Sequence, residues 1–323
     1  MIDLHLHLDG SLPVQTVIEL AKSQNIQLPA WDPVLLKQQL SVPENCQNLA
    51  EYIACFKTPL RLLQTRGAIG LAVSGLLAAL EEQGLWYAEI RFAPALHTQR
   101  GLTQSQVVKA AAEALQKGLV GKRLKAALIL CCMRGEANDA DNHETLKVAQ
   151  DYLGHGVAAV DLAGDEHGFP TEKYRGLFKT ADTMGLPFTL HAGEAAGADS
   201  IRLALEYGAK RIGHGVRAGE DQGVIDYLKE HQIPLEMCVT SNLQTRAVAG
   251  IRQHPILQYL RDGLCVTCNT DNMTVSNTTL QKEFQLLETE LGLRRQDKEK
   301  LIFNSIEAAF LPEKEKQKLY GIR

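Results

Sequence analysis

The chain has 323 residues, of which 45% are hydrophobic and 22% are charged, so it can bury a substantial core and is neither disordered nor fibrous. Its 34 basic residues against 38 acidic ones leave a net charge of −4, which argues against binding to nucleic acid or to an anionic membrane surface. The longest apolar stretches fall short of the roughly 18 residues of a membrane span, and residues 1–5 do not resemble a secretory signal, so a cytoplasmic protein is predicted.

Short apolar runs rich in branched residues alternate with stretches of helical period, a pattern typical of βα units around a parallel sheet. The helical stretches include Thr103–Lys117 and Asp221–Glu230. The runs expected to be strands are Ile2–Leu8, Trp86–Phe92, Leu124–Cys132, Val157–Leu162, Pro187–His191, Arg211–His214, Pro234–Val239 and Cys265–Asn269. Eight strands predict an α/β fold, a (β/α)8 TIM barrel, whose usual size of about 250 residues leaves room for insertions. Residues 1–323 are therefore expected to form a single domain.

The longest connection lies between the first two strands, where residues 14–82 must hold several helices over the barrel mouth. Within it, Phe56, Leu60 and Leu63 could form an apolar lid or could serve only to pack these helices. After Asp271 the chain is predicted to continue as extra charged helices.

His5 and His7 lie two residues apart on the first strand. Side chains alternate along a strand, so both imidazoles are expected to point into the barrel while the leucines between them face the helices. An H-x-H pair alone is a weak signal, and its value depends on what the other strands supply.

Further polar groups follow the later strands, at the end of a barrel where active sites form. His191 ends the fifth strand and Glu194 follows it, His214 ends the sixth, and Asp271 follows the eighth. Each of these residues alone would more often be a turn or cap residue, but together with the histidine pair they predict one site.

Three imidazoles and one carboxylate suit a single Zn²⁺ with a position left for water. Zinc lowers the pKa of its bound water to about 7, and the remaining imidazole and Glu194 could transfer protons in a hydrolysis. The fourth strand contains neither the lysine nor the glutamate that would bridge a second metal, so one metal is expected.

These motifs resemble those of the adenosine deaminase family of the amidohydrolase superfamily, over essentially the whole chain. The matching segments are His5–Ser11, Asp161–Glu166, His191–Glu194, Gly213–Gly215 and Thr270–Asp271. The resemblance implies deamination of adenosine and 2′-deoxyadenosine to the inosines and ammonia, in purine salvage.

By the same resemblance, zinc would be held by His5, His7, His191 and Asp271, and Asp271 would also orient the attacking water. Glu194 would protonate N1 of the purine, and His214 would position the hydroxide and assist its deprotonation as it attacks C6. The residues implied in substrate binding are His7, Asp9 at the ribose 5′-hydroxyl, the Gly164 N–H at N3, Asn272 at N7, and Phe56 in the lid.

Asn272 departs from the family pattern, which has a second aspartate at this position. An asparagine amide donates a hydrogen bond without titrating, so a contact with N7 is still expected. Asp9 indicates a nucleoside, since relatives that act on adenine carry glutamate there.

Two other functions remain open: deamination of adenine or another aminopurine derivative, and a non-catalytic zinc-binding barrel. The presence of both Glu194 and His214 favours an enzyme. Arg91 could be a buried structural cation or could shape the lid. The remaining histidines are expected at the surface or as caps: His97, His143, His155, His167, His231 and His254.

Overall fold

A computed structural model describes residues 1–43, 46 and 49–321. Parts of the predicted insertion, 44–45 and 47–48, and the last two residues of the predicted domain lie outside the described residues. The strands are β1 (Ile2–His7), β2 (Tyr87–Phe92), β3 (Lys125–Met133), β4 (Val157–Ala163), β5 (Thr189–Ala192), β6 (Arg211–His214), β7 (Leu235–Met237) and β8 (Val266–Cys268). Each overlaps its predicted run, which confirms the order of the strands.

The strands form a closed parallel barrel. They pair in chain order as two four-stranded sheets, β1 to β4 and β5 to β8. Single bridges join the sheets, from Val160 to Phe188 on one side and from Leu6 to Asp271 on the other. The predicted (β/α)8 barrel is therefore confirmed.

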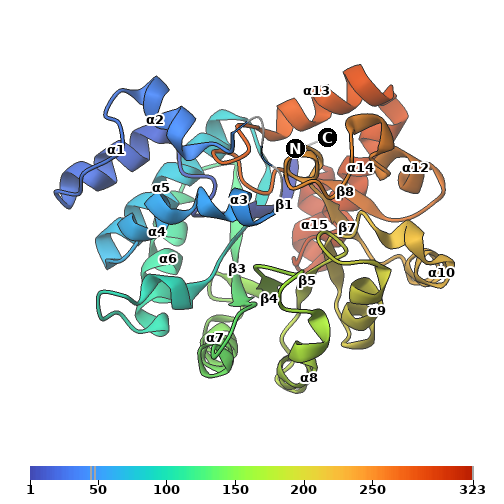
Figure 1. The fold of residues 1–323 in the computed structure, drawn as a ribbon, viewed down its shortest axis with the longest axis horizontal. Coiled ribbons are helices and arrows are strands. Elements are labelled where there is room, and N and C mark those ends of the chain that lie inside the picture. Colours follow the sequence, from blue (N-terminus) through green and yellow to red (C-terminus); the bar gives the residue numbers. More distant parts are fainter. Residues whose placement is uncertain (44–45, 47–48, 322–323) are drawn as a thin grey trace.

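Helices cover the outside of the barrel, around the central strands (Figure 1). They begin where the sequence offers caps: Thr103 makes a capping box with Gln106 before α6, and the Asp221 side chain caps α10. The helices along the barrel are η1 (Pro94–His97), α6 (Gln104–Gly118), α7 (Asp139–Tyr152), η2 (Thr171–Tyr174), α8 (Arg175–Thr183), α9 (Ala198–Glu206), η3 (Ala218–Glu220), α10 (Gln222–His231), α11 (Val239–Gln244), η4 (Ile251–Gln253) and α12 (Ile256–Arg261).

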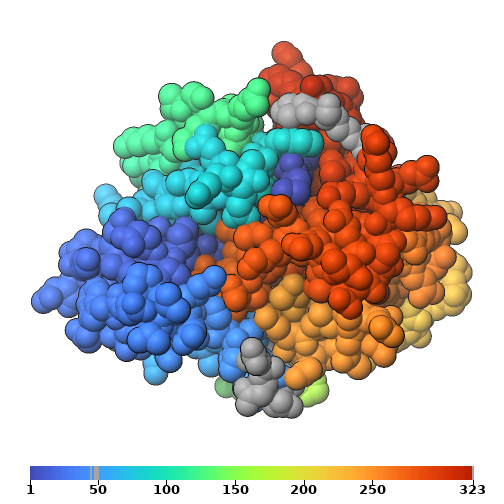
Figure 2. All heavy atoms as spheres, turned by 90° about the horizontal axis from the view of Figure 1, so that it is seen from above, coloured from blue at the N-terminus to red at the C-terminus, as the bar shows by residue number. Residues whose placement is uncertain are grey.

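The long connection after β1 is helical, as predicted. It contains α1 (Val14–Ser23), α2 (Pro33–Leu40), α3 (Leu49–Ala54), α4 (Lys57–Leu62) and α5 (Arg66–Glu82). Figure 2 shows this N-terminal part, in blue, against the orange segment that follows β8. Val42 N donates to Val275 O at 2.8 Å and Ser41 Oγ to Thr274 O at 2.8 Å, so the insertion is attached beside the strand ends.

The predicted C-terminal helices are also present, as α13 (Leu280–Leu291), α14 (Arg295–Ala308) and α15 (Glu313–Tyr320). The Asn304 side chain on α14 donates to Val266 O of β8 at 2.9 Å, which fixes this helix to the barrel. Among the described residues, every helix is too short or too polar to cross a lipid bilayer.

Charged side chains fill much of the barrel interior, where branched apolar residues are more usual. The buried leucines of β1 face the helices, as predicted. On the inner side, Arg91 contacts Asp161 and Glu236, and Arg211 contacts Glu89 and Glu236. These side chains are at most 1% exposed, and a buried charge needs such a partner because its desolvation is costly.

Candidate active site

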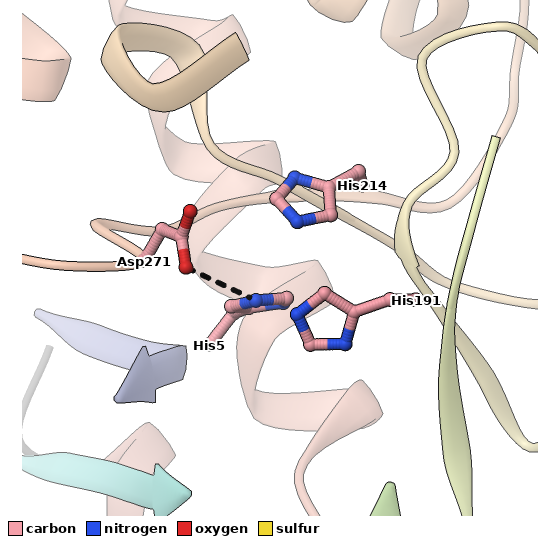
Figure 3. A group of neighbouring side chains, drawn as sticks. All are labelled: His5, His191, His214 and Asp271. Carbon is pink, nitrogen blue, oxygen red and sulfur yellow. Dashed lines mark ion pairs between the residues drawn. The ribbon is translucent and has the colours of Figure 1, made fainter. Parts of the chain in front are cut away.

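Strands β1, β5 and β6 and the segment after β8 bring three of the predicted ligands together with His214, which was predicted to be catalytic. One nitrogen from each of His5, His191 and His214 and one oxygen from Asp271 lie within 4.8 Å of one another. Figure 3 shows the three rings and the carboxylate around a common space. His214 and Asp271 have left-handed backbone conformations, with φ of 61° and 62°, which a non-glycine residue adopts at some cost.

His7 joins this group on the open side. Its Nε2 lies 3.3 Å from His191 Nε2 and 3.4 Å from Asp271 Oδ1, and His5 Nε2 lies 3.5 Å from the same oxygen. Tetrahedral ligands bound to zinc at about 2.0–2.1 Å lie about 3.3–3.4 Å from one another. The three distances that join His7 to His191, His7 to Asp271 and His5 to Asp271 are close to this spacing.

The protonation of these groups also fits a cation. His5 Nδ1 donates to Glu236 Oε2 at 2.8 Å and His191 Nδ1 to Asp161 Oδ2 at 2.9 Å, and in a neutral ring with this tautomer the Nε2 atom carries a lone pair. His5 Nε2 and Asp271 Oδ1 are buried without a hydrogen bond. Acceptor atoms that face each other in a buried site repel one another unless a cation lies between them.

Arg91 is a buried structural cation and does not contribute to the lid. Its Nη1 donates to Asp161 Oδ2 at 3.0 Å and its Nη2 to Glu236 Oε2 at 2.8 Å. The carboxylates that orient His191 and His5 are thus joined by one guanidinium, and partners of this kind fix the rotamer and basicity of metal ligands.

Glu194 lies beside the cluster as a buried carboxyl group. Thr245 Oγ1 donates to its Oε1 at 3.0 Å, and its Oε2 lies 3.6 Å from His214 Nε2. Burial, followed by the negative charge of Asp271, raises the pKa of Glu194 to about 8. The carboxyl group is therefore protonated at neutral pH and can act as an acid.

A hydrogen-bond chain sets the tautomer of His214. Ile256 N donates to His254 Nδ1, His254 Nε2 lies 3.3 Å from Asn242 Oδ1, and Asn242 Nδ2 lies 3.0 Å from His214 Nδ1. Burial, followed by the charge of His5, holds the pKa of His214 well below its usual value. The ring is neutral, and its proton lies on Nε2, which faces Glu194.

An open cavity lies above these groups. The predicted substrate residues His7, Asp9, Phe56, Gly164 and Asn272 all line it. The Asn272 side chain can take its position only because residue 10 is a glycine, since a Cβ on Gly10 would lie 1.8 Å from Asn272 Oδ1. Every predicted site residue except His5 lines this cavity, and His5 is fully buried beside it, with its ring next to those of His7, His191 and His214.

The apolar wall differs in part from the expected lid. Phe56 and Leu60 line the cavity together with Tyr52 and Ile53, which the sequence did not single out. Leu63 was expected in the lid but is fully buried in the main core. It follows the last turn of α4, where its side chain packs inward.

Some histidines also differ from expectation. His97 was expected at the surface or as a cap but is buried at the end of η1 against Phe92. His254 is buried as well, and its hydrogen bond to Asn242 links it to His214. Asn242 lies on α11 and Thr245 directly after it, so the strand-end pattern used to predict the ligands gave no signal for them.

Comparisons with known proteins find relatives that match almost the whole chain. A family model described as Adenosine deaminase matches residues 1–321. Adenosine deaminase of Haemophilus ducreyi is 49% identical, covering 99% of this chain and 94% of its own length. Adenine deaminase from Arthrobacter aurescens superimposes with a TM-score of 0.89 at 29% identity, over 98% of this chain and 96% of its own. N6-methyl-AMP deaminase from Arabidopsis thaliana does so with a TM-score of 0.83 at 25% identity, over 99% and 95%. The protein therefore belongs to the adenosine deaminase family of hydrolytic deaminases.

Proposed function

We propose that this protein is a zinc-dependent enzyme that converts adenosine and 2′-deoxyadenosine to the corresponding inosines and ammonia, in cytoplasmic purine salvage. The observation that carries the proposal is the buried convergence of His5 Nε2 and Asp271 Oδ1, which lack hydrogen bonds, beneath a cavity that also contains the Glu194 carboxyl group. The relative from Haemophilus ducreyi, named as an adenosine deaminase, supports the choice of substrate.

Zinc would be held by His5, His7, His191 and Asp271, since nitrogen and carboxylate ligands at tetrahedral spacing suit this ion. When bound, it supplies the Lewis acid that activates a water molecule at neutral pH. The Ser241 hydroxyl donates to the other oxygen of Asp271, Oδ2, at 2.5 Å. This hydrogen bond fixes the orientation of the carboxylate for metal binding.

Proton transfer would fall to Glu194. Attack of water at C6 pushes an electron pair onto N1 of the purine, and the protonated Glu194 would supply the proton there. The proton that the water gives up would pass to the amino group, and the C6–N6 bond would then break to release ammonia. His214 would position the attacking oxygen through its Nε2–H. Because its Nδ1 is occupied by Asn242, the hydrogen bonds favour this positioning role over the base role also expected of it.

The substrate would be oriented by the cavity wall. The backbone N–H of Gly164 would donate to N3, the Asn272 amide to N7, and Phe56 would cover the base. Burial raises the pKa of Asp9 to about 6, so at neutral pH it carries a charge that would accept from a ribose 5′-hydroxyl and repel a 5′-phosphate. This favours a nucleoside over a nucleotide.

The test follows the ultraviolet spectra of adenosine, 2′-deoxyadenosine, adenine, AMP and N6-methyl-AMP with purified protein, before and after a chelator, together with zinc analysis. We expect turnover of the two nucleosides alone, about one zinc per chain, and loss of activity on chelation that added zinc restores. Higher kcat/KM on adenine or on a nucleotide would contradict the choice of substrate, and no turnover by zinc-loaded protein would favour a binding role.

The same assay tests the contact of Asn272 with N7. We expect 7-deazaadenosine, which lacks the N7 acceptor, to have a kcat/KM lower by about 10-fold or more, the worth of one hydrogen bond to a buried partner. Equal turnover of the two compounds would remove Asn272 from that role.

A further inference from the structure

Glu166 makes an unusual set of hydrogen bonds and has so far no function in the site. Its Oε1 accepts from Gly193 N at 2.8 Å and from Ser200 Oγ at 2.5 Å. Its Oε2 accepts from the N–H groups of Glu194, Ala195 and Ala196 at 3.0, 2.7 and 3.0 Å. One buried carboxylate thus gathers the four consecutive N–H groups of residues 193–196.

These four N–H groups need such an acceptor. Residues 193–196 lie between the end of β5 and the start of α9 and have no regular secondary structure. Gly193 turns the chain with a φ of +71°, and a Cβ there would lie 2.5 Å from Ile201 Cδ1. Successive N–H groups at such a turn form a concave site for an anion, and an ionised carboxylate offers about four acceptor positions.

The loop held in this way carries Glu194. We propose that Glu166 is a positioning residue for catalysis, whose carboxylate shapes the 193–196 loop so that the Glu194 carboxyl group points at the substrate base. The proposal rests on the proposed function, in which Glu194 protonates N1. It assigns a role to a residue of the Asp161–Glu166 segment that contacts neither the cavity nor the metal ligands.

Glu166 also connects the loop after β4, which contains Gly164, with the loop after β5, which contains Glu194. It lies two residues after Gly164, whose N–H is proposed to bind N3, and it holds the residue proposed to protonate N1. A purine that uses both groups needs them at one fixed separation, because a misplacement of about 1 Å can cost about 10²-fold in rate. The negative charge of Glu166 is in addition one of the influences that raise the pKa of Glu194.

The experiment compares Glu166→Gln with wild type. The amide keeps one acceptor oxygen but turns N–H donors toward the loop, so we expect kcat to fall by about 10²-fold, a smaller change in KM, and unchanged zinc content. Hydrogen exchange of the 193–196 amides should become faster. Asp165→Asn is the matched control, since this neighbouring carboxylate is exposed and accepts from Gly168 N of its own loop, and it should leave kcat and exchange unchanged.

A double-mutant cycle separates positioning from general stability. If Glu166 acts through Glu194, the Glu166→Gln change should cost little further kcat in a Glu194→Gln background, measured in single turnovers with enzyme in excess. The same loss in both backgrounds, or wild-type kcat and exchange in Glu166→Gln, would overturn the proposal.

If Glu166→Gln does not fold, Glu166→Asp replaces it, since the shorter side chain keeps the charge but withdraws its oxygens from the loop. If wild type itself does not turn over adenosine, the proposed function fails, and amide exchange alone then decides whether Glu166 shapes the loop.

Discussion

Glu194 is the residue whose role can be tested most directly, because it contacts no predicted ligand and has no assigned role except proton transfer. We expect Glu194→Gln to keep its zinc and to lose about 10²–10⁴-fold in kcat, the usual worth of a general acid. Kinetics and metal analysis on the same sample check this. Activity near that of wild type would show that another group protonates the base.

The pH dependence of the reaction follows from the same side chain. The raised pKa of Glu194, about 8, keeps the carboxyl group protonated below that pH, and an acid catalyst is lost as it deprotonates. We expect kcat/KM to fall as the pH rises through about 8, and this limb should be missing from the residual activity of Glu194→Gln. A rate that stays flat to pH 10 would contradict the assignment.

Arg91 should act on the metal from a distance. Arg91→Met removes the charge that joins Asp161 and Glu236, and we expect zinc affinity to fall by about 10–100-fold, as for other partners of metal ligands. Chelator competition measures this. Arg91→Lys is the control: it keeps the charge but cannot bond both carboxylates at once, so its affinity should lie between the two. Wild-type affinity in Arg91→Met would limit Arg91 to a role in folding.

Much of the site could be predicted from sequence because its predicted ligands lie on strands or just after them, and apolar runs reveal strands. The side chains that form hydrogen bonds with these ligands could not be predicted. Glu236 lies within β7 and contacts His5, 231 residues away, and no local pattern predicts a bond of that range. Glu166 appeared only as part of a motif, because its function lies in backbone groups of another loop.

At the scale of elements, α3 and α4 form one wall of the cavity and are held by a contact across its mouth. Tyr52 OH lies 2.6 Å from Ser276 Oγ, on the segment after β8. We expect Tyr52→Phe to raise KM for adenosine by up to about 10-fold, since one hydrogen bond contributes about 0.5–1.5 kcal/mol, with kcat changed little. Steady-state kinetics check this.

The matched control is Ile53→Val on the same helix, which trims the wall but leaves the hydrogen bond in place. If Tyr52→Phe instead lowers kcat and leaves KM unchanged, Tyr52 acts on the reacting atoms, and a contact other than its hydrogen bond to Ser276 holds the wall in place. Leu63 shows why the extent of this wall could not be predicted, since apolar spacing marks a buried helix face without telling which cavity or core it meets.

At the scale of the whole molecule, we propose that residues 1–323 form one domain. The interior charges, the ligands and the C-terminal helices are joined across the barrel, for example by Arg211 Nη1 donating to Ala308 O at 2.8 Å. We expect one unfolding transition, with a Tm that falls by several degrees when zinc is removed, because a ligand that binds only the folded state stabilises it. Two separate transitions, or a Tm insensitive to chelation, would contradict this.

The closure of the barrel has a consequence for how the protein is made. β1 meets the segment after the last strand at the proposed metal site, where His7 N donates to Asp271 O at 2.7 Å and Asp271 N to His5 O at 2.8 Å. A ribosome delivers the histidines of β1 first and Asp271 only after most of the chain has emerged. The growing chain therefore lacks the proposed carboxylate ligand until late in synthesis. If the proposed metal site forms, its completion has to follow the arrival of β8 and the closure of the barrel.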